Sequence, residues 1–161
     1  LRLGATDEHS IRSVLTIVKV NNELERIADC AVIVAESAIN HKNLIASAPP
    51  TFRVMANSVI GMARDTNLAL TDTDTNLALR VLSFDDTVDR FRKEIVMDVQ
   101  NRISTGALEP LVAFELLAVT RAMERVADHC TNICEQVIYL DTGKIVRHLP
   151  EGWTAPENPS F

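Results

Sequence analysis

Apolar residues recur in steps of three and four along most of the chain, the spacing that places them on one face of an α-helix. The pattern is clearest near the C-terminus, where it runs without interruption from Leu116 to Leu140. Pro110 precedes this stretch and Gly143 follows it, and these residue types favour the first turn and the C-cap of a helix. We therefore predict a helix between them.

Three further stretches carry the same period, so we predict four long helices and an all-α, antiparallel helical bundle. Asp7 is the expected N-cap of the first helix, and the two prolines at 49 and 50 are expected to stop it. We predict no strands, and we expect the proline-rich tail after Gly143 to be an extended strap or disordered. The first three predicted helices span roughly residues 8–47, 52–71 and 77–104.

Composition supports the same fold class and excludes several functions. The chain is 47% hydrophobic but only 4% aromatic, which favours helices packed through aliphatic side chains. A net charge of -6, without a basic cluster, argues against nucleic acid as a partner. No apolar run is long enough for a transmembrane helix and no leader opens the chain, so we expect a cytoplasmic protein. Three cysteines fit reduced thiols better than a disulfide framework.

One phrase occurs twice, as LERIADC at 24–30 and as MERVADHC at 123–130, at a constant offset of 99 positions. The second copy ends a triplet of predicted helices, so the first copy should end a similar triplet. We therefore expect residues 1–48 to be the last helix of a first three-helix repeat, with about 50 or more residues, two helices, missing before it. Residues 51–143 would be a second repeat, and 144–161 a C-terminal tail.

Each copy of the phrase carries two carboxylates four residues apart on one helix face, with Cβ atoms about 5 to 6 Å apart. These pairs are Glu25 with Asp29 and Glu124 with Asp128. Two like charges at this spacing repel each other weakly, by some tenths of a kcal/mol. Their repetition at matched positions therefore points to a bound cation.

The third predicted helix adds Asp85 and Asp89 at the same spacing. If the turn after this helix centres near residue 105, these residues and the second-copy pair differ in height by only about 4 Å. Four carboxylates could then face one another across two antiparallel helices. Clusters of oxygen ligands alone suit hard cations such as Mg²⁺, Ca²⁺, Mn²⁺ or ferric iron.

Plainer interpretations remain open beside this one. An acidic stripe is often only a solvated face, and Arg26, Arg121 and Arg125 are spaced for ordinary surface ion pairs with the same carboxylates. The protein could then be a metal-free helical scaffold that binds partners through its surface. A metal-storing or redox-active protein is a third candidate, although Glu-x-x-His pairs are absent from the last helix. No nucleophile elbow, phosphate loop or dinucleotide fingerprint occurs, so we expect no enzyme.

The stretches NNELERIADCAVIVAES and RAMERVADHCTNICEQVIYLDTGKIVRH, supported by FDDTVDRFRKEI, resemble the PhoU family over nearly the whole chain. The resemblance implies tandem three-helix repeats, of which this chain would contain helices three to six. It also implies surface sites for iron, or for Mg, Mn, Ca or Zn ions, built from an acidic residue, three residues and an Asp. Carried over by position, the metal ligands would be Glu25, Asp29, Asp85, Asp89, Glu124 and Asp128, with Asn132 as a further candidate.

The resemblance implies a function that the pattern of residues alone does not. PhoU-like proteins are taken to be adaptors that restrain phosphate uptake and phosphate-starvation signalling. The expected partners are the ATPase subunit of a phosphate ABC transporter and a sensor histidine kinase, which would hold the protein at the inner membrane; a homodimer is left open. We expect no catalytic residues.

Overall fold

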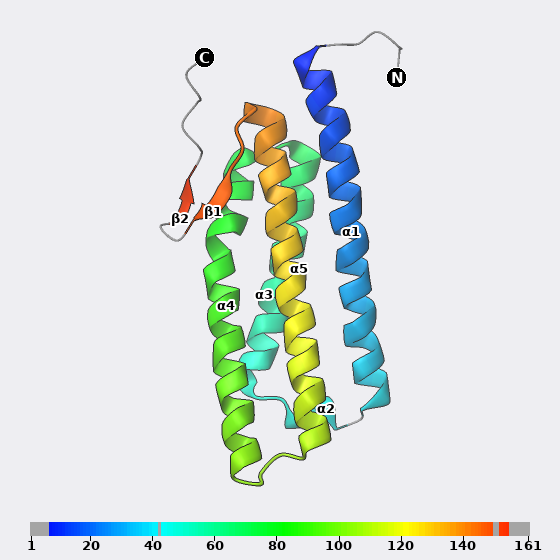
Figure 1. Cartoon of the computed structure of the whole chain (residues 1–161), viewed down its shortest axis with the longest axis vertical. Helices are drawn as coiled ribbons and strands as arrows, with labels where there is room; N and C mark the ends of the chain where they lie inside the picture. The colour runs from blue at the N-terminus through cyan, green and yellow to red at the C-terminus, as the bar shows by residue number, and fades with distance from the viewer. Residues whose placement is uncertain (1–6, 42, 150–151, 155–161) are drawn as a thin grey trace.

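The computed structural model describes residues 7–41, 43–149 and 152–154, and it places four long helices side by side in an antiparallel bundle (Figure 1). The all-α fold class is confirmed. A short helix, α2, bridges the first and second long helices. The helices are α1 (Glu8–Asn40), α2 (Leu44–Ser47), α3 (Pro50–Asp72), α4 (Thr75–Ser104) and α5 (Pro110–Thr142).

Asp7 and Gly143 cap helix ends as predicted, and Asp74 caps a third. The Asp7 carboxylate accepts a hydrogen bond from the backbone N–H of Ser10 at 2.9 Å and so caps α1. Asp74 caps α4 in the same way through the N–H of Leu77 at 3.0 Å. Gly143 ends α5 in the left-handed conformation, with φ of 71°, which glycine adopts without strain.

The predicted end of the first helix is wrong. We expected it near residue 47, but α1 ends at Asn40. At this turn Glu115 of α5 accepts a hydrogen bond from the Ser37 hydroxyl at 3.1 Å and lies 3.4 Å from Nε2 of His41. These contacts hold the turn against α5. The prolines therefore do not stop α1; Pro50 begins α3, because its fixed φ suits the first helical position.

The tail also differs from the prediction of no strands. Strand β1 (Arg147–Leu149) pairs with β2 (Gly152–Thr154) in an antiparallel hairpin. Trp153 and Thr154 are residue types that favour strands, and the proline and glycine at positions 150 and 152 are types common in turns, so the local sequence is compatible with a hairpin. The rest of the tail, at 150–151 and 155–161, lies outside the described residues.

Helix α5 forms the centre of the molecule, because α1, α3 and α4 all pack against it. Its apolar stripe is almost completely buried, as predicted; Leu116, Ile133 and Val137 have no exposed surface. In the part of the chain that the structure describes, no helix is both long and apolar enough to cross a membrane.

The equivalent stripe of α1 is much more exposed, against our expectation of a seam facing partner helices. Ile17 is 67% exposed, whereas its repeat equivalent Leu116 is 0% exposed. Likewise Leu24 is 47% exposed, whereas Met123 is 6% exposed. The reason is that α5 lies beneath α3 and α4, whereas the main neighbour of α1 among the described helices is α5 alone.

Candidate functional site

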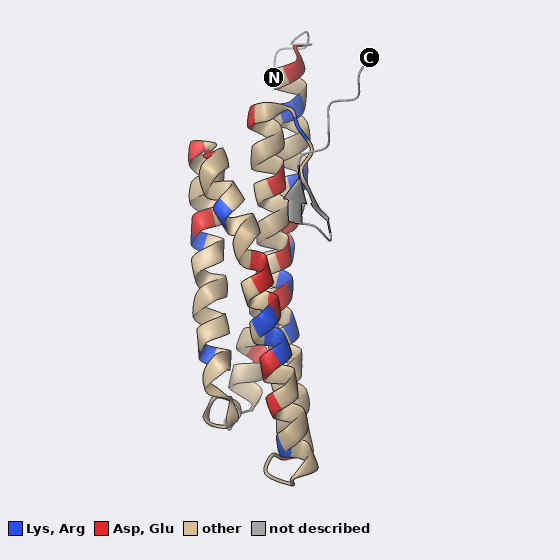
Figure 2. Ribbon diagram, turned by 90° about the vertical axis from the view of Figure 1, so that its left-hand side faces the viewer, with Lys and Arg blue, Asp and Glu red and all other residues tan. Residues whose placement is uncertain are grey.

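Asp89 on α4 lies near Glu124 and Asp128 on α5, as the heights of the two helices predicted. The negative charge of Asp89 on α4 raises the pKa of both Glu124 and Asp128 on α5, which requires the three groups to be close. Figure 2 shows acidic and basic positions gathered along the middle and lower parts of these helices, whereas α3 carries few.

Burial adds to the repulsion within this acidic cluster, which we define as Asp89, Glu124 and Asp128. Desolvation is the largest cause that raises the pKa of Glu124, and the neighbouring charges of Asp128 and Asp89 raise it further. Desolvation also raises the pKa of Asp128, followed by the charge of Asp89. The surroundings therefore disfavour the charged form of both groups, which is the electrostatic condition that an added cation relieves.

A positively charged side chain of the protein, that of Arg92, already contacts the acidic cluster. Nε of Arg92, one turn after Asp89 on α4, lies 2.8 Å from Oε1 of Glu124. The positive charge of Arg92 lowers the pKa of Glu124 and of Asp128, which opposes the effects of desolvation and of the acidic neighbours. This pair was not predicted from the sequence, because the spacing within one helix indicated ion pairs between the acids of α5 and arginines of the same helix.

The cluster does not present a finished metal site. Among the residues that the structure describes, no three His, Cys, Asp or Glu side chains converge closely enough to hold a metal ion. Asp85, the fourth predicted ligand of this site, is half-buried, and its charge acts on Cys130 further along α5. Cation binding would therefore need side-chain movement.

The predicted ligands on α1 are much more exposed to solvent. Glu25 and Asp29 are both exposed, and the main neighbour of α1 in the described part of the chain is α5. This first-repeat pair has no counterpart of α4 beside it among the described residues. The structure therefore brings the α4 and α5 acids together, but it adds no partner acids to the α1 pair.

A polar cluster between α1 and α5 was not found from the sequence. Oε2 of Glu23 lies 2.7 Å from Nδ1 of His129 and accepts a hydrogen bond from the Asn132 side-chain amide at 3.0 Å. His129 is buried. Asn132, the further candidate ligand, is thus turned toward α1. An antiparallel register for the first and last helices could have indicated this contact.

Glu23 shows opposing effects on its pKa. Desolvation is the largest influence and raises the pKa. The hydrogen bonds from Asn132 and His129, together with the charge of His129, outweigh it and leave the pKa of Glu23 below its ordinary value. The ionised carboxylate is therefore the form that this interface stabilises.

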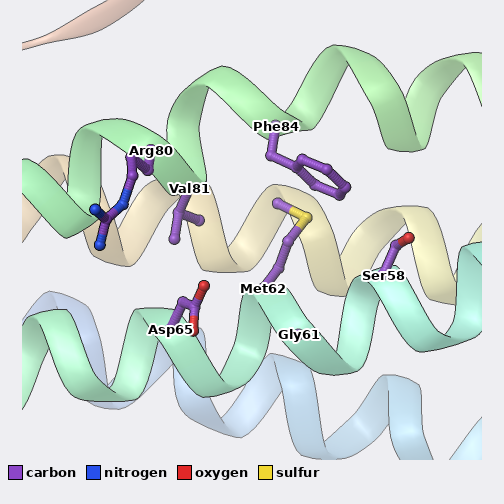
Figure 3. A pocket seen from close by; sticks show the side chains of 7 residues that line it. All are labelled: Ser58, Gly61, Met62, Asp65, Arg80, Val81 and Phe84. Carbon is purple, nitrogen blue, oxygen red and sulfur yellow. The ribbon is translucent and has the colours of Figure 1, made fainter.

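Two hollows lie between the helices of the second repeat. A cleft of about 400 Å³ between α4 and α5 borders the acidic cluster, and the side chains that line it include Arg92, Arg121 and Glu124. A second hollow, of about 290 Å³, lies between α3 and α4, where Asp65 and Arg80 line it together with the apolar side chains of Met62, Val81 and Phe84 (Figure 3). No candidate ligand from the sequence lines this second hollow.

The cysteines of α5 are buried and poor ligands. Burial, the largest cause, raises the pKa of Cys130 to about 11 and that of Cys134 to about 12. The hydroxyl of Thr66 lies 3.6 Å from Sγ of Cys134. Because the thiolate is the nucleophile and the metal ligand, these thiols suit packing rather than reaction at neutral pH.

Comparisons with known proteins agree with the resemblance found in the sequence. The family described as PhoU domain matches residues 52–137. The phosphate-specific transport system accessory protein PhoU homolog 1 of Thermotoga maritima is 33% identical over 88% of this chain and 62% of its own length. The PhoU homolog of Zymomonas mobilis is 32% identical over 94% of this chain and 62% of its own length. The chain thus spans less than two thirds of these relatives.

Solved structures show the same fold. The crystal structure of PhoU from Pseudomonas aeruginosa superposes with a TM-score of 0.78 at 30% identity, and the match covers 89% of this chain and 68% of that one. The phosphate transport system regulatory protein PhoU from Streptococcus pneumoniae superposes with a TM-score of 0.80 at 23% identity, over 90% and 69% of the two chains.

Proposed function

Because the chain belongs to the PhoU domain family, we propose that it regulates phosphate uptake and phosphate-starvation signalling by binding other proteins. The observation that carries the proposal is the likeness to accessory proteins of phosphate-specific transport systems over most of the chain. The proposed partners are the ATPase subunit of a phosphate ABC transporter and a sensor histidine kinase. An adaptor of this kind needs surfaces rather than a catalytic centre.

Deletion of the gene tests this regulatory role. We expect a deletion strain to express a phosphate-starvation reporter in phosphate-rich medium, and we expect the intact gene to restore repression. Initial rates of phosphate uptake, measured in the same strains, should be higher in the deletion strain. Unchanged reporter expression and unchanged uptake would contradict the proposed function.

We propose in addition that the acids of α4 and α5 hold a hard cation. The type of donor suits such a cation, because Asp85, Asp89, Glu124 and Asp128 supply oxygen ligands only, but the side chains would have to move to converge on it. The electrostatics support the same ligand, since desolvation and mutual repulsion raise the pKa of Glu124 and Asp128. A bound cation would supply positive charge that links α4 to α5. Glu25 and Asp29 would form the second site once further helices cover α1.

Metal content of purified protein tests the site. Asp89→Asn and Asp128→Asn each remove one charged ligand with little change in shape, so we expect both variants to retain less metal than the wild type in elemental analysis. Glu94→Gln, at an exposed acid on the same helix as Asp89, is the control and should retain it. Equal metal content in all four proteins would refute the site.

The metal-free scaffold remains a second candidate, and the Arg92 to Glu124 ion pair favours it, because a protein cation already partly neutralises the acidic cluster. The two functions differ in their response to chelation. If the scaffold is correct, treatment with a chelator leaves the binding of the proposed partners unaltered. If the cation organises the surface, the same treatment weakens that binding.

A further inference from the structure

We propose that the cleft between α4 and α5 is a docking site for an amphipathic helix of a partner protein, which presents a carboxylate to Arg121 and aliphatic side chains to the apolar part of the cleft. The inference rests on the proposed function, and it names the chemistry by which the regulator would bind another protein. The cleft has a volume of about 400 Å³. A groove between two helices commonly receives the apolar face of a third helix.

Arg121 supplies a positive charge that the described part of the protein does not pair. The spacing along α5 predicted an ion pair with Glu124, but Oε1 of Glu124 lies 2.8 Å from Nε of Arg92 on α4 instead. Arg121 is exposed, lines the cleft and forms no ion pair among the described residues. Its guanidinium is therefore available to a carboxylate of another molecule, and its planar group can bind both carboxylate oxygens at once.

Apolar side chains continue the cleft toward the turn between α4 and α5. Val96 of α4 and Leu117 of α5 line the cleft itself. Ile103, two turns after Val96 on the same face of α4, is 39% exposed. Phe114, two turns before Arg121 on the same face of α5, is 68% exposed. Aromatic and aliphatic side chains beside an arginine are the residue types that anchor a protein partner.

The acids beyond Arg121 determine how the partner helix must be arranged. Asp128 lies two turns after Arg121 on the same face of α5, and Asp89 of α4 is close to it. A helix that lies along the cleft therefore meets apolar, positive and negative surface in that order. The complementary helix carries aliphatic, acidic and basic residues at successive turns. This order disfavours a uniformly acidic partner, which Asp128 and Asp89 would repel.

A helical peptide tests this complementarity without a known partner. The peptide places leucine, leucine, glutamate and lysine at successive turns of one face and carries a fluorophore for anisotropy measurements. We expect it to bind the wild-type protein, and we expect Arg121→Glu to weaken binding by about tenfold, because two like charges then meet. Arg53→Glu, at an exposed arginine of α3 outside the cleft, makes the same change of net charge and should alter the affinity by less than about twofold.

Reversal of both charges is the sharper measurement. A second peptide has lysine in place of the glutamate, and it should bind Arg121→Glu more tightly than it binds the wild type. Phe114→Ala should weaken binding of the first peptide by about three- to tenfold, whereas Ile60→Ala, at an exposed apolar residue of α3, should not. Because all these side chains are exposed, the variants are expected to fold as the wild type does.

The possible outcomes separate this inference from the proposed function. Equal affinity of the two peptides for the wild type, or no binding of either, overturns the proposed occupant of the cleft. A lower weight-average mass of Arg121→Glu than of the wild type in sedimentation would make a second copy the occupant and also overturns it.

The two proposed partners, purified and tested with the same variants, complete the comparison. Weaker partner binding by Arg121→Glu and Phe114→Ala than by the wild type supports the cleft. Equally strong partner binding by all the proteins overturns the cleft and keeps the regulatory function. Selective binding of the first peptide without binding of either partner keeps the cleft and contradicts the proposed partners.

Discussion

At the scale of residues, two glycines differ in how much the fold depends on them. Gly143 has φ of 71° at the end of α5, and an added Cβ would collide with the guanidinium of Arg12 on α1. Gly61 lies inside α3, where an added Cβ would meet nothing within 4 Å. The backbone conformation requires the first glycine, whereas Arg12 could move aside because its guanidinium is the end of a flexible side chain. Gly61 has no such role; it only increases the conformational entropy of the unfolded chain, which is lost on folding.

The two alanine variants should therefore change stability in opposite directions. Gly143→Ala should lower the free energy of unfolding by about 1 to 3 kcal/mol, through left-handed strain and the displaced Arg12. Gly61→Ala should raise it by about 0.5 to 1 kcal/mol, as expected inside a helix. Urea unfolding followed by circular dichroism measures both. A destabilised Gly61→Ala would indicate a close contact at that site that the structure does not contain.

At the scale of helices, two groups of polar contacts join α1 to α5. One is the cluster of Glu23, His129 and Asn132, and the other is formed by Ser37, His41 and Glu115. At the positions of the repeat equivalent to Glu23 and His129 lie Ala122 and Cys30, both buried and without a charge. A one-turn slip of α1 would separate Glu23 from His129, so the polar contacts fix a register that apolar contacts alone would not.

Removal of the Glu23 carboxylate should weaken this interface. Glu23→Ala leaves a buried histidine without its partner, so we expect a loss of about 1 to 3 kcal/mol of unfolding free energy. Glu25→Ala, at an exposed acid on the same helix, is the control and should change it by less than about 0.5 kcal/mol. Equal effects of the two variants would contradict the assignment.

The pH dependence of the same variant gives a further check of this prediction. The pKa of Glu23 lies below its ordinary value of 4.5 in the folded protein, so its contribution to stability is fully present above pH 4.5. It is lost as the pH falls through the folded-state pKa. The stability difference between wild type and Glu23→Ala should accordingly shrink in acid.

At the scale of the whole molecule, the second repeat covers its apolar surface and α1 does not. The outer side of α1 carries apolar residues whose equivalents on α5 are buried by α3 and α4. Ile39 is 75% exposed, for example, whereas its equivalent Ile138 is 3% exposed. We infer that two helices equivalent to α3 and α4 belong on this face, in agreement with the greater length of the relatives.

A protein of these 161 residues should self-associate through the open face of α1, because exposed apolar surface of this extent favours contact between molecules. Ile17→Lys places a charge in that face and should lower the weight-average mass in sedimentation experiments at high protein concentration. Ile60→Lys changes an isoleucine of similar exposure on α3 and should leave association unchanged. A wild-type protein that stays monomeric would contradict this prediction.

Local sequence was sufficient for the four long helices, except for the end of α1, and for the level of the acids once the helices on either side of the turn near residue 105 are taken as antiparallel neighbours. Periodic apolar residues, Asp7, Asp74 and Gly143 define helix ends through contacts within a few residues, and a fixed rise per residue brings Asp89 level with Glu124. These properties depend on neighbours along the chain.

The packing of the bundle determined the rest. The burial of α5, the exposure of the matching stripe on α1, the Arg92 contact with Glu124 and the Glu23 contact with His129 all join residues distant in sequence. Each depends on how far a helix is rotated about its axis and on what covers it, and periodicity within one helix carries neither quantity. The same apolar stripe is therefore a core in one repeat and a surface in the other.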